Sequence, residues 1–598
     1  MFKKRRLLIL VFCMVMQFAR SQQYKIHSHN DYQQNVPFWN AYANGLNSIE
    51  VDIFLKNDTL FATHGELEIV KDRTIENLYL QPIEKALALQ LNPQQELQLL
   101  VDIKSDAYAT MKELLTALEQ YPDIIHNDNI SIVISGNRPK PSEYLNYPEY
   151  IKFDHQSLES PNEEKLWDKI ALISLNFKMF SPWNGKGRLT EVDYEKIKGI
   201  IDKAHSYDKP FRFWGAPDSK TAWKAFKDLG VDFINTDLPY ASSSYLNTLD
   251  QRVYYNKVTS EVYSPNFESD QKNTPVKNII LLIGDGNGLS QISSSVLANG
   301  GDLTLTQLKS IGLLKTQSAD DFTTDSAAAG TALATGKKTN NRSIGVDPAG
   351  QPLTNITELL FEHGYVSGCI TTDNITGATP SAFYAHRKDR SDSNGIISDL
   401  SKSKLSLLIG GGAEAFEKET AEMGFTLLEG ISAIARSKEK RVGHFISNED
   451  APSILEGRGA LLAAATKNGL AFLKAKNAPF FLMVEGAKID SYGHLNNVSG
   501  IVSEGIDFDR AITEAVKFAD ANGNTLVIVT ADHETSGFSI PQGNLENKMI
   551  EGDFTTQDHT GTMVPIFAYG PHSHEFQGVY DNSSVFGKIL KVLNIGVN

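Results

Sequence analysis

The chain has 598 residues, 41% of them hydrophobic, and a formal net charge of −15. Its length exceeds the size at which a single hydrophobic core stops growing, so we expect two domains. The negative charge argues against a broad nucleic-acid-binding surface, which requires an excess of lysine and arginine.

The N-terminal segment, residues 1–21, has the order of a secretory signal peptide. Four basic residues precede an apolar stretch from Leu7 to Phe18, and small residues follow at Ala19 and Ser21. We expect cleavage after Ser21. The apolar stretch is shorter than the roughly 20 residues of a membrane span, which argues against a retained anchor.

Cleavage would remove five basic and no acidic residues, so the formal charge would fall from −15 to −20. It would leave Cys369 as the only cysteine, which excludes an internal disulfide. The sequence therefore predicts a periplasmic or secreted bacterial protein whose stability comes from large cores.

Short apolar runs alternate with polar, helix-like stretches between residues 24 and 239. The runs are 48–55, 60–63, 97–103, 130–134, 169–174, 211–214 and 231–235, and an eighth is expected near Tyr24. This rhythm is typical of βα units that close into a (β/α)8 barrel. We expect the barrel to occupy residues 22–245 and a linker to follow at 246–275.

Polar residues suited to phosphate chemistry stand at the ends of these runs, where barrel enzymes build their sites. They are His29, Glu50, Asp52, His64, Asp102, Lys104 and Trp214. Glu50 and Asp52 alternate along one strand, so both face the barrel interior. With Asp102 they offer enough carboxylates for one Mg²⁺ or Ca²⁺. Two histidines beside such a metal can act as base and acid, although either one alone would be an ordinary loop residue.

The motifs Ser-Ile-Glu-x-Asp, Thr-His-Gly and Asp-Ile-Lys resemble those of the glycerophosphodiester phosphodiesterase and phospholipase C-like barrel superfamily, which includes a phospholipase D toxin branch. The resemblance implies metal ligands at Glu50, Asp52 and Asp102, acid–base roles for His29 and His64, and phosphate contact by Lys104. His-Asn-Asp at 29–31 replaces the His-Arg-Gly of many diesterases. Two alternatives stay open: hydrolysis of glycerophosphodiesters, or non-catalytic binding of phospholipid or glycan head groups.

In the second half, three apolar runs each end in a side chain that can bind a metal. Residues 278–284 lead to Asp285, residues 479–484 to Glu485, and residues 525–530 to Asp532 and His533. One such acid would be an ordinary turn or helix cap. Three of them predict a metal site, because ligands gather at the carboxyl ends of the strands in an open α/β sheet.

Asp325 and Ser326 open an Ala-rich segment that is expected to be a helix. A helix N-terminus suits a phosphate, although a plain helix cap explains this pair equally well. Ser326 becomes a nucleophile only if its pKa is lowered, which a metal at Asp285 could do.

Asp490 and His494 are four residues apart, so on a helix both would face one metal. A surface Asp–His pair is the alternative. One cation would leave several of the acids in this half repelling one another, whereas two or three would neutralise them.

These residues, in this order, resemble the alkaline phosphatase family over residues 276–598. The resemblance implies a doubly wound α/β domain that hydrolyses phosphate monoesters, with Ser326 as nucleophile and Arg390 as phosphate clamp. Two Zn²⁺ and one Mg²⁺ are implied. Their ligands would be Asp490, His494 and His559 for one zinc, Asp285, Asp532 and His533 for the other, and Asp285, Thr379 and Glu485 for magnesium.

Three points stay open within this resemblance. Arg387 and Lys388 lie close enough to Arg390 in sequence to compete for its role. A phosphodiesterase or phosphomutase of the same superfamily is the alternative activity. The interval 414–478, expected to be helices and loops, corresponds to an interface insertion in relatives, and a homodimer rests on that correspondence only.

Gly377 departs from the family pattern, in which an acidic or imidazole side chain often contacts water around the magnesium. Because glycine lacks this side chain, we predict that the third metal is bound more weakly and exchanges more readily, while the zinc pair stays intact.

Overall fold

The structure, a computed structural model, describes residues 24–161, 163–416 and 424–596. It divides into two compact units, Met1–Leu249 and Asp250–Asn598, here called unit 1 and unit 2. The expected signal peptide lies outside the described residues. Among the described helices, none combines the length and apolar composition needed to cross a membrane.

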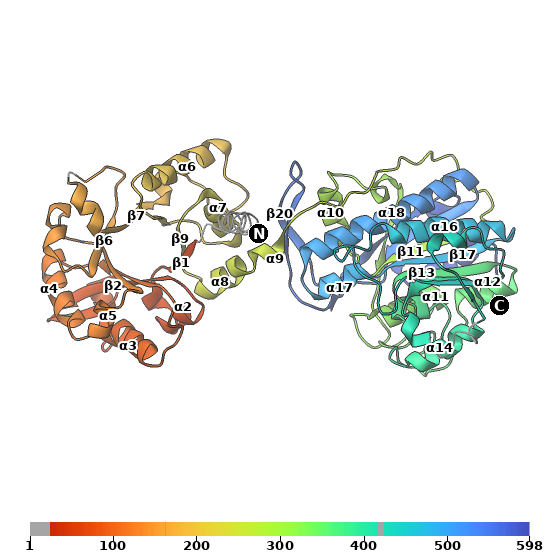
Figure 1. The fold of residues 1–598 in the computed structure, drawn as a ribbon, viewed down its shortest axis with the longest axis horizontal. Helices are drawn as coiled ribbons and strands as arrows, with labels where there is room; N and C mark the ends of the chain where they lie inside the picture. Colours follow the sequence, from red (N-terminus) through yellow and green to blue (C-terminus); the bar gives the residue numbers. More distant parts are fainter. Residues whose placement is uncertain (1–23, 162, 417–423, 597–598) are drawn as a thin grey trace, which may run out of the picture. The chain divides into compact units, whose positions relative to one another are not determined.

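Unit 1 is a closed barrel of eight parallel strands (Figure 1). In order around the barrel they are β1 (Lys25–Ser28), β9 (Phe233–Thr236), β8 (Phe211–Trp214), β7 (Ile170–Asn176), β6 (Ile151–His155), β5 (Ile130–Gly136), β4 (Leu97–Ile103) and β2 (Ser48–Lys56). Pairing of β1 with β2 closes the ring. The predicted (β/α)8 fold is confirmed, and its first strand lies next to Tyr24 as expected.

The run 60–63 is not a barrel strand, contrary to the prediction. It forms β3 (Thr59–Ala62), which pairs antiparallel with the end of β2. Asn57 and Asp58 between them have φ angles of 50° and 55°, as in the two-residue turn of a hairpin. The turn residues carried the signal for a hairpin, and the apolar run alone did not.

The barrel strand β6 was not predicted from the sequence. Lys152 and Asp154 interrupt its apolar residues, which conceals the strand pattern. Asp154 is nevertheless buried and accepts hydrogen bonds from Ser135 and Ser174. The barrel interior therefore contains a buried polar network at a position where an apolar side chain would have made the strand recognisable.

Helices cover the outside of the barrel. They are α2 (Trp39–Ala43), α3 (Gln81–Ala88), α4 (Ala107–Leu118), α5 (Pro122–Ile125), α6 (Glu191–His205), α7 (Lys220–Leu229) and α8 (Pro239–Asn247). In α7, Ser219 caps the first turn and Gly230 ends the helix in a left-handed conformation. Its buried Phe226 packs against Phe213 of β8. Local signals and an apolar face together hold α7 against the barrel.

Unit 2 contains a ten-stranded mixed sheet. Its strands, in spatial order, are β15 (Thr426–Leu427), β16 (Val442–Phe445), β14 (Leu405–Gly411), β13 (Val366–Asn374), β17 (Phe480–Gly486), β11 (Asn278–Gly284), β18 (Thr525–Ala531), β23 (Val564–Tyr569), β12 (Ser310–Lys315) and β24 (Gly578–Asp581). The strands from β15 to β18 are parallel, whereas β23 is antiparallel to both of its neighbours. The sheet confirms the predicted α/β class.

Alternate residues of the central strands enter two separate cores. In β11, Leu281 packs into one core and Leu282 into the other. Because both faces are covered, these strands are apolar along their whole length. This is why the sequence shows them as continuous apolar runs that end in a polar side chain.

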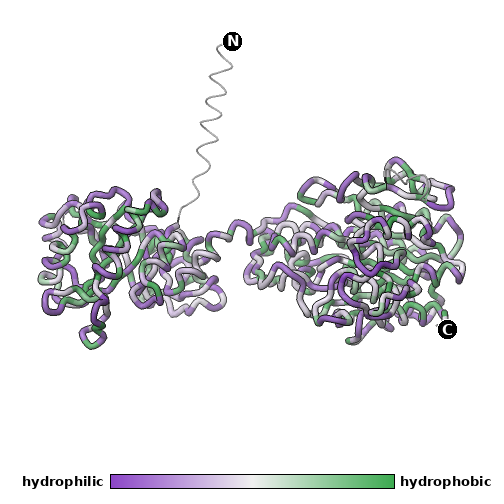
Figure 2. Tube along the Cα trace, turned by 90° about the horizontal axis from the view of Figure 1, so that it is seen from below, coloured by the Kyte–Doolittle hydropathy of each residue, from purple (hydrophilic) through white to green (hydrophobic). Residues whose placement is uncertain are grey.

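Helices lie on both faces of this sheet, with α11, α12 and α14 on one side and α10, α16 and α18 on the other (Figure 1). The helices are α10 (Leu289–Ala298), α11 (Ser326–Thr335), α12 (Ile356–Glu362), α13 (Ala378–Ser381), α14 (Ser393–Lys402), α15 (Ile431–Ile434), α16 (Leu461–Ala475), α17 (Lys488–His494), α18 (Val498–Asn522) and α19 (Ser584–Val592). Figure 2 shows hydrophobic segments running through the interior of each unit.

Two intervals differ from expectation. The interval 414–478 contributes β15 and β16 to the edge of the sheet, although it was expected to hold only helices and loops; β16 includes the polar His444, so it lacks an apolar run. The expected linker contains α9 (Leu249–Arg252) and β10 (Val253–Tyr255). In unit 2, β10 forms a small sheet with β21 (Met549–Asp553) and β20 (Ser539–Asn544).

Replacing Gly500 by alanine should destabilise unit 2. A Cβ at this position in α18 would overlap the ring of Tyr492 in α17, and such overpacking costs about 1–3 kcal/mol. Gly587, inside α19, has open space around its Cβ position among the described residues. Gly587→Ala should therefore be neutral or stabilise by up to ~1 kcal/mol. Denaturant unfolding of both variants tests this, and equal midpoints would contradict it.

Candidate functional site

The three central strands of unit 2 deliver their terminal side chains to one place. β11 pairs with β17 and with β18, and Ile283 lies opposite both Glu485 and Thr530. Asp285 follows β11 directly, and Asp532 and His533 follow β18. The strand register therefore brings Asp285 together with side chains that lie 200 or more residues later in the sequence.

Asp490, His494 and His559 form a compact group of metal-type ligands, with one ligand atom of each within 4.8 Å of the others. Asp490 and His494 share one face of α17, and His559 begins the short strand β22 (His559–Thr560), which pairs with β19 (Glu534–Thr535). Nε2 of His494 lies 3.3 Å from Asp490 Oδ2, and Nε2 of His559 lies 3.5 Å from Asp490 Oδ1. This is the first of the two predicted zinc groups.

Backbone carbonyls set the orientation of both of these imidazoles. Nδ1 of His494 lies 2.6 Å from the carbonyl of Gln557, and Nδ1 of His559 lies 2.8 Å from that of Thr324. A carbonyl can only accept, so Nδ1 carries the proton in each ring. The lone pair of each neutral ring is then on Nε2, the atom that faces Asp490, as zinc ligation requires.

A second group surrounds His533. Its Nε2 lies 3.4 Å from Asp285 Oδ1 and 3.3 Å from Asp532 Oδ2, as predicted for the second zinc. Asp285, His533 and Asp490 also have one ligand atom each within 4.8 Å of the others. Asp490 therefore lies between the two groups. The sequence did not indicate this bridging position of Asp490.

Glu485 and Thr379, predicted to bind magnesium with Asp285, are both buried. Thr371 of β13, which was not predicted, donates a hydrogen bond to Glu485 Oε2. Burial and the negative charge of Asp373 raise the pKa of Glu485 to about 8. Burial and the carboxylates of Asp532, Asp490 and Glu485 raise the pKa of Asp285 well above its usual range.

Several buried oxygens of this cluster have no well-directed hydrogen bond within the described parts of the chain. They are Oγ1 of Thr379, and Oδ1 of Asp285 and Oδ2 of Asp532, which share the single Nε2 of His533 at 3.4 and 3.3 Å. An unpaired buried polar oxygen costs about 1–3 kcal/mol, and bound cations would satisfy all three. The carboxylate and imidazole groups suit two zinc ions, and the oxygen-only set at Glu485 suits magnesium.

Ser326 begins α11, and its Oγ lies 3.2 Å from His533 Nε2. Asp325 caps the helix by accepting a hydrogen bond from the Ala328 N–H. Arg390 Nη1 lies 3.1 Å from Asp325 Oδ2 and is therefore held beside the serine. The hydroxyl, the arginine and the helix N-terminus can all contact one phosphate.

Arg387, in contrast, pairs with α14. Its guanidinium donates to Asp399 Oδ1 at 2.5 Å and to the Gly395 carbonyl at 2.7 Å. Of the two arginines, Arg390 is therefore the one that can serve as the predicted phosphate clamp.

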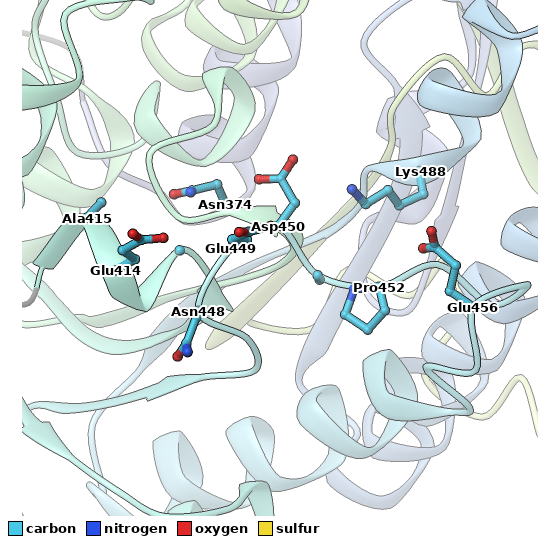
Figure 3. A pocket seen from close by; sticks show the side chains of 11 residues that line it. Asn374, Glu414, Ala415, Asn448, Glu449, Asp450, Pro452, Glu456 and Lys488 are labelled. Carbon is cyan, nitrogen blue, oxygen red and sulfur yellow. The ribbon is translucent and has the colours of Figure 1, made fainter.

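A cavity of about 750 Å³ lies beside β13 and α17 (Figure 3). The sequence did not indicate this cavity. Asn374 at the end of β13 and Lys488 at the start of α17 line it, together with Glu414, Asp450 and Glu456. The cavity wall therefore belongs to the same strand and helix that carry Thr371 and Asp490.

In unit 1, Glu50, Asp52 and Asp102 offer ligand atoms within 4.8 Å of one another. Asp52 and Asp102 lie opposite each other on β2 and β4. Lys104 Nζ lies 3.4 Å from Asp52 Oδ2 and 3.1 Å from Asp102 Oδ1. Burial and the charge of Glu50 raise the pKa of Asp102 to about 6.

Each predicted acid–base histidine of the barrel is oriented by a carboxylate. His29 Nδ1 lies 2.7 Å from Asp237 Oδ1, and His64 Nδ1 lies 2.7 Å from Asp52 Oδ2. Burial lowers the pKa of His29, but the contacts with Asp237 and Glu50 outweigh it, so the net shift is upward. Trp214 joins both histidines in lining a cavity of about 350 Å³.

Two buried residues missed from the sequence hold Glu50. Arg212 of β8 lies 2.8 Å and His27 of β1 lies 2.9 Å from Glu50 Oε2. Burial and the Arg212 charge lower the pKa of His27 to about 3, so this imidazole is neutral. The alternation Phe-Arg-Phe-Trp in β8 was the only available sign that Arg212 points inward.

The barrel carboxylates also fit a cation. Oδ1 of Asp52 is buried without a hydrogen-bond partner within the described ranges, and Oδ1 of Asp102 lies 3.1 Å from the Lys104 ammonium. Three carboxylates face Arg212 and Lys104, which leaves about one negative charge for a divalent ion to satisfy. The choice between Mg²⁺ and Ca²⁺ stays a prediction.

The fold and side chains of unit 2 define a hydrolase of phosphate esters that depends on metal ions. The sequence profile of the alkaline phosphatase family matches residues 276–448, 432–550 and 542–595, more than half of the chain, and the chain belongs to this family. Residues 17–137 match the AIM6-like phosphodiesterase domain, and residues 210–240 match the glycerophosphoryl diester phosphodiesterase family. The suspected fusion is thus confirmed.

Individual relatives align with the second half. Alkaline phosphatase 4 of Bacillus subtilis (strain 168) is 30% identical over 417 residues, 54% of this chain and 90% of the relative. The solved alkaline phosphatase of the Antarctic bacterium TAB5 is 41% identical with a TM-score of 0.52, over 54% of this chain and 99% of that one. A substituted form of the TAB5 enzyme, 40% identical with a TM-score of 0.51 over the same shares, has Mg bound in its M3 site.

Arg390→Ala should weaken the binding of inorganic phosphate by about ten- to a hundredfold, because hydrogen bonds to a charged group contribute roughly 1.5–3 kcal/mol. Arg387→Ala should instead lower the Tm and leave phosphate affinity unchanged, since Arg387 pairs with Asp399. Competitive inhibition of p-nitrophenyl phosphate hydrolysis, together with thermal unfolding, measures both effects. Equal losses of phosphate affinity in the two variants would reject Arg390 as the clamp.

Proposed function

We propose that unit 2 hydrolyses phosphate monoesters through a phosphoserine at Ser326. The 3.2 Å contact between Ser326 Oγ and His533, inside the ligand cluster, carries this proposal. Arg390, beside Asp325, supports it because a guanidinium can bind two oxygens of a phosphate dianion.

In the proposed reaction, the Ser326 hydroxyl attacks phosphorus in line with the ester oxygen. Two zinc ions bound at the Asp490 and Asp285 groups would lower the pKa of the serine and stabilise the leaving oxygen. The bond from phosphorus to the ester oxygen breaks, the serine proton is lost to solvent, and the leaving oxygen takes up a proton from water and departs as the alcohol. Water then cleaves the phosphoserine from the opposite side, so the configuration at phosphorus is retained overall.

For unit 1 we propose cleavage of phosphodiesters, such as glycerophosphodiesters or phospholipid head groups. His29 and His64 would act as acid and base, and Lys104 would contact the phosphate. The contacts of the two histidines with Asp237 and Asp52 support these roles. If the product is an open monoester it is a substrate for Ser326, whereas a cyclic phosphate is still a diester. A barrel that binds such esters without turnover is the alternative.

We also propose that the protein is exported, with its signal peptide removed after Ser21, and acts in the periplasm or outside the cell. The basic, apolar and small-residue order of residues 1–21 supports this. A homodimer stays a prediction from the family resemblance.

Ser326→Ala should reduce monoester hydrolysis by roughly 10³-fold or more, because the attacking group is removed. When the wild type reacts with a substrate that carries a labelled phosphate and the reaction is quenched, the label should be found on Ser326. Ser293→Ala, on the outer face of α10, is the control and should retain full activity. Undiminished phosphate release by the Ser326 variant would refute the mechanism.

The paired substitution Glu50→Gln and Asp52→Asn should abolish diester cleavage and spare p-nitrophenyl phosphate turnover. The reason is that both carboxylates belong to the barrel cluster and neither belongs to unit 2. Matched mono- and diester substrates assay the two activities. Loss of both would show that the sites are not independent, and diester cleavage lost only with Ser326→Ala would assign that activity to unit 2. Metal-dependent binding of diesters by a wild type without turnover would establish the binding alternative.

A further inference from the structure

Gly377 lies two residues before Thr379 and caps the N-terminus of α13. The space beside it is filled. A Cβ at position 377 would overlap Oδ2 of Asp373 and approach the carbonyl oxygen of Asn374 to 2.9 Å. The missing side chain therefore leaves no gap, because a carboxylate from four residues earlier occupies its place.

Asp373 and Glu485 are linked through one threonine. The backbone N–H of Asp373 donates to Thr371 Oγ1 at 2.8 Å, and Thr371 donates in turn to Glu485 Oε2. The negative charge of Asp373 raises the pKa of Glu485. Asp373 is therefore fixed close to the oxygen ligands predicted for magnesium.

Among the described residues Asp373 forms no ion pair with a basic side chain, and the backbone N–H of Asn374 is what stabilises its carboxylate. The charges of Lys488 and Arg390 lower the pKa of Asp373. In the described portion of the chain, however, neither side chain lies within ion-pair distance of the Asp373 carboxylate. A partly buried carboxylate that faces another acid is unfavourable unless a cation lies between or beside them. A hard cation at Glu485 and Thr379 would remove this repulsion.

We propose that Asp373 is an additional binding residue of the third metal site and supplies the carboxylate that position 377 lacks. The proposal rests on the metal-dependent phosphatase proposed above. It also replaces the expectation, drawn from Gly377 alone, that this cation is weakly held. Asp373 contacts the water shell of a Mg²⁺-class ion, while Asp285, Thr379 and Glu485 bind the ion itself.

The test measures metal binding by the full-length, zinc-loaded protein. Mg²⁺ affinity is determined by calorimetry, and zinc and magnesium contents are determined after dialysis. Asp373→Asn should weaken Mg²⁺ binding at least tenfold and leave two zinc ions per chain. Asp450→Asn is the matched control. Asp450 is another acid on the cavity wall (Figure 3), and its charge raises the pKa of Asp373. Its Mg²⁺ affinity should stay within twofold of the wild type.

An exchange of the two side chains tests the geometry. Gly377→Asp alone should lower the Tm, because the new side chain collides with Asp373. Asp373→Gly combined with Gly377→Asp should restore both the Tm and the Mg²⁺ affinity. Restored affinity would also show that Asp373→Asn acts at the metal site and not by general misfolding.

Three results would overturn the proposal: Mg²⁺ affinity unchanged in Asp373→Asn, equal losses in Asp373→Asn and Asp450→Asn, or no Mg²⁺ binding by the wild type. A wild type that binds Mg²⁺ through Asp373 but does not hydrolyse monoesters would support this assignment and refute the proposed function. The two failures are therefore distinguishable.

Discussion

Asp285, Glu485, Asp490 and Asp532 converge where the central strands of unit 2 end, and three of the four are almost fully buried. Burial removes the water that would screen these charges, and their mutual repulsion makes the shared site unfavourable without cations. The cluster is therefore stable as a set of anions only when metal ions occupy it. Metal binding and the folding of this region should thus be coupled, because carboxylates that form no ion pair with lysine or arginine among the described residues supply the ligands.

The scaffold around the cluster fixes α17, the helix that carries Asp490 and His494. Tyr492 of this helix donates a hydrogen bond to Ser453 at 2.7 Å. The loop that contains Ser453 is held against α18 by the buried Arg458, which lies 2.5 Å from Glu504 and 3.0 Å from Asp507. A buried pair of this kind adds little net stability, but loss of one partner is costly. Its role is therefore best understood as positioning, since it fixes the loop that in turn holds the ligand helix.

The sequence predicted the ends of β11, β17 and β18 because strands buried on both faces are apolar without interruption, so a terminal Asp or Glu stands out. It did not predict β6, in which polar residues enter the barrel interior. Arg212 and His27 were missed for a related reason, since a charge inside a short strand has no distinctive local pattern. The proposed role of Asp373 could not be predicted from the sequence either, because only the folded structure shows that its carboxylate fills the space next to Gly377.

The two sites balance charge in different ways, although both are predicted to bind phosphate esters. In the barrel, Arg212 and Lys104 pair directly with Glu50, Asp52 and Asp102, so one divalent ion is enough to neutralise the remainder. In unit 2, the ion pairs formed by the four converging acids within the described residues involve histidines only. Imidazoles that bind zinc through Nε2 are neutral and bring no positive charge, so the charge must then come from the bound metal. On this charge balance we expect a single cation in unit 1 and several in unit 2 before a phosphate dianion can approach Ser326.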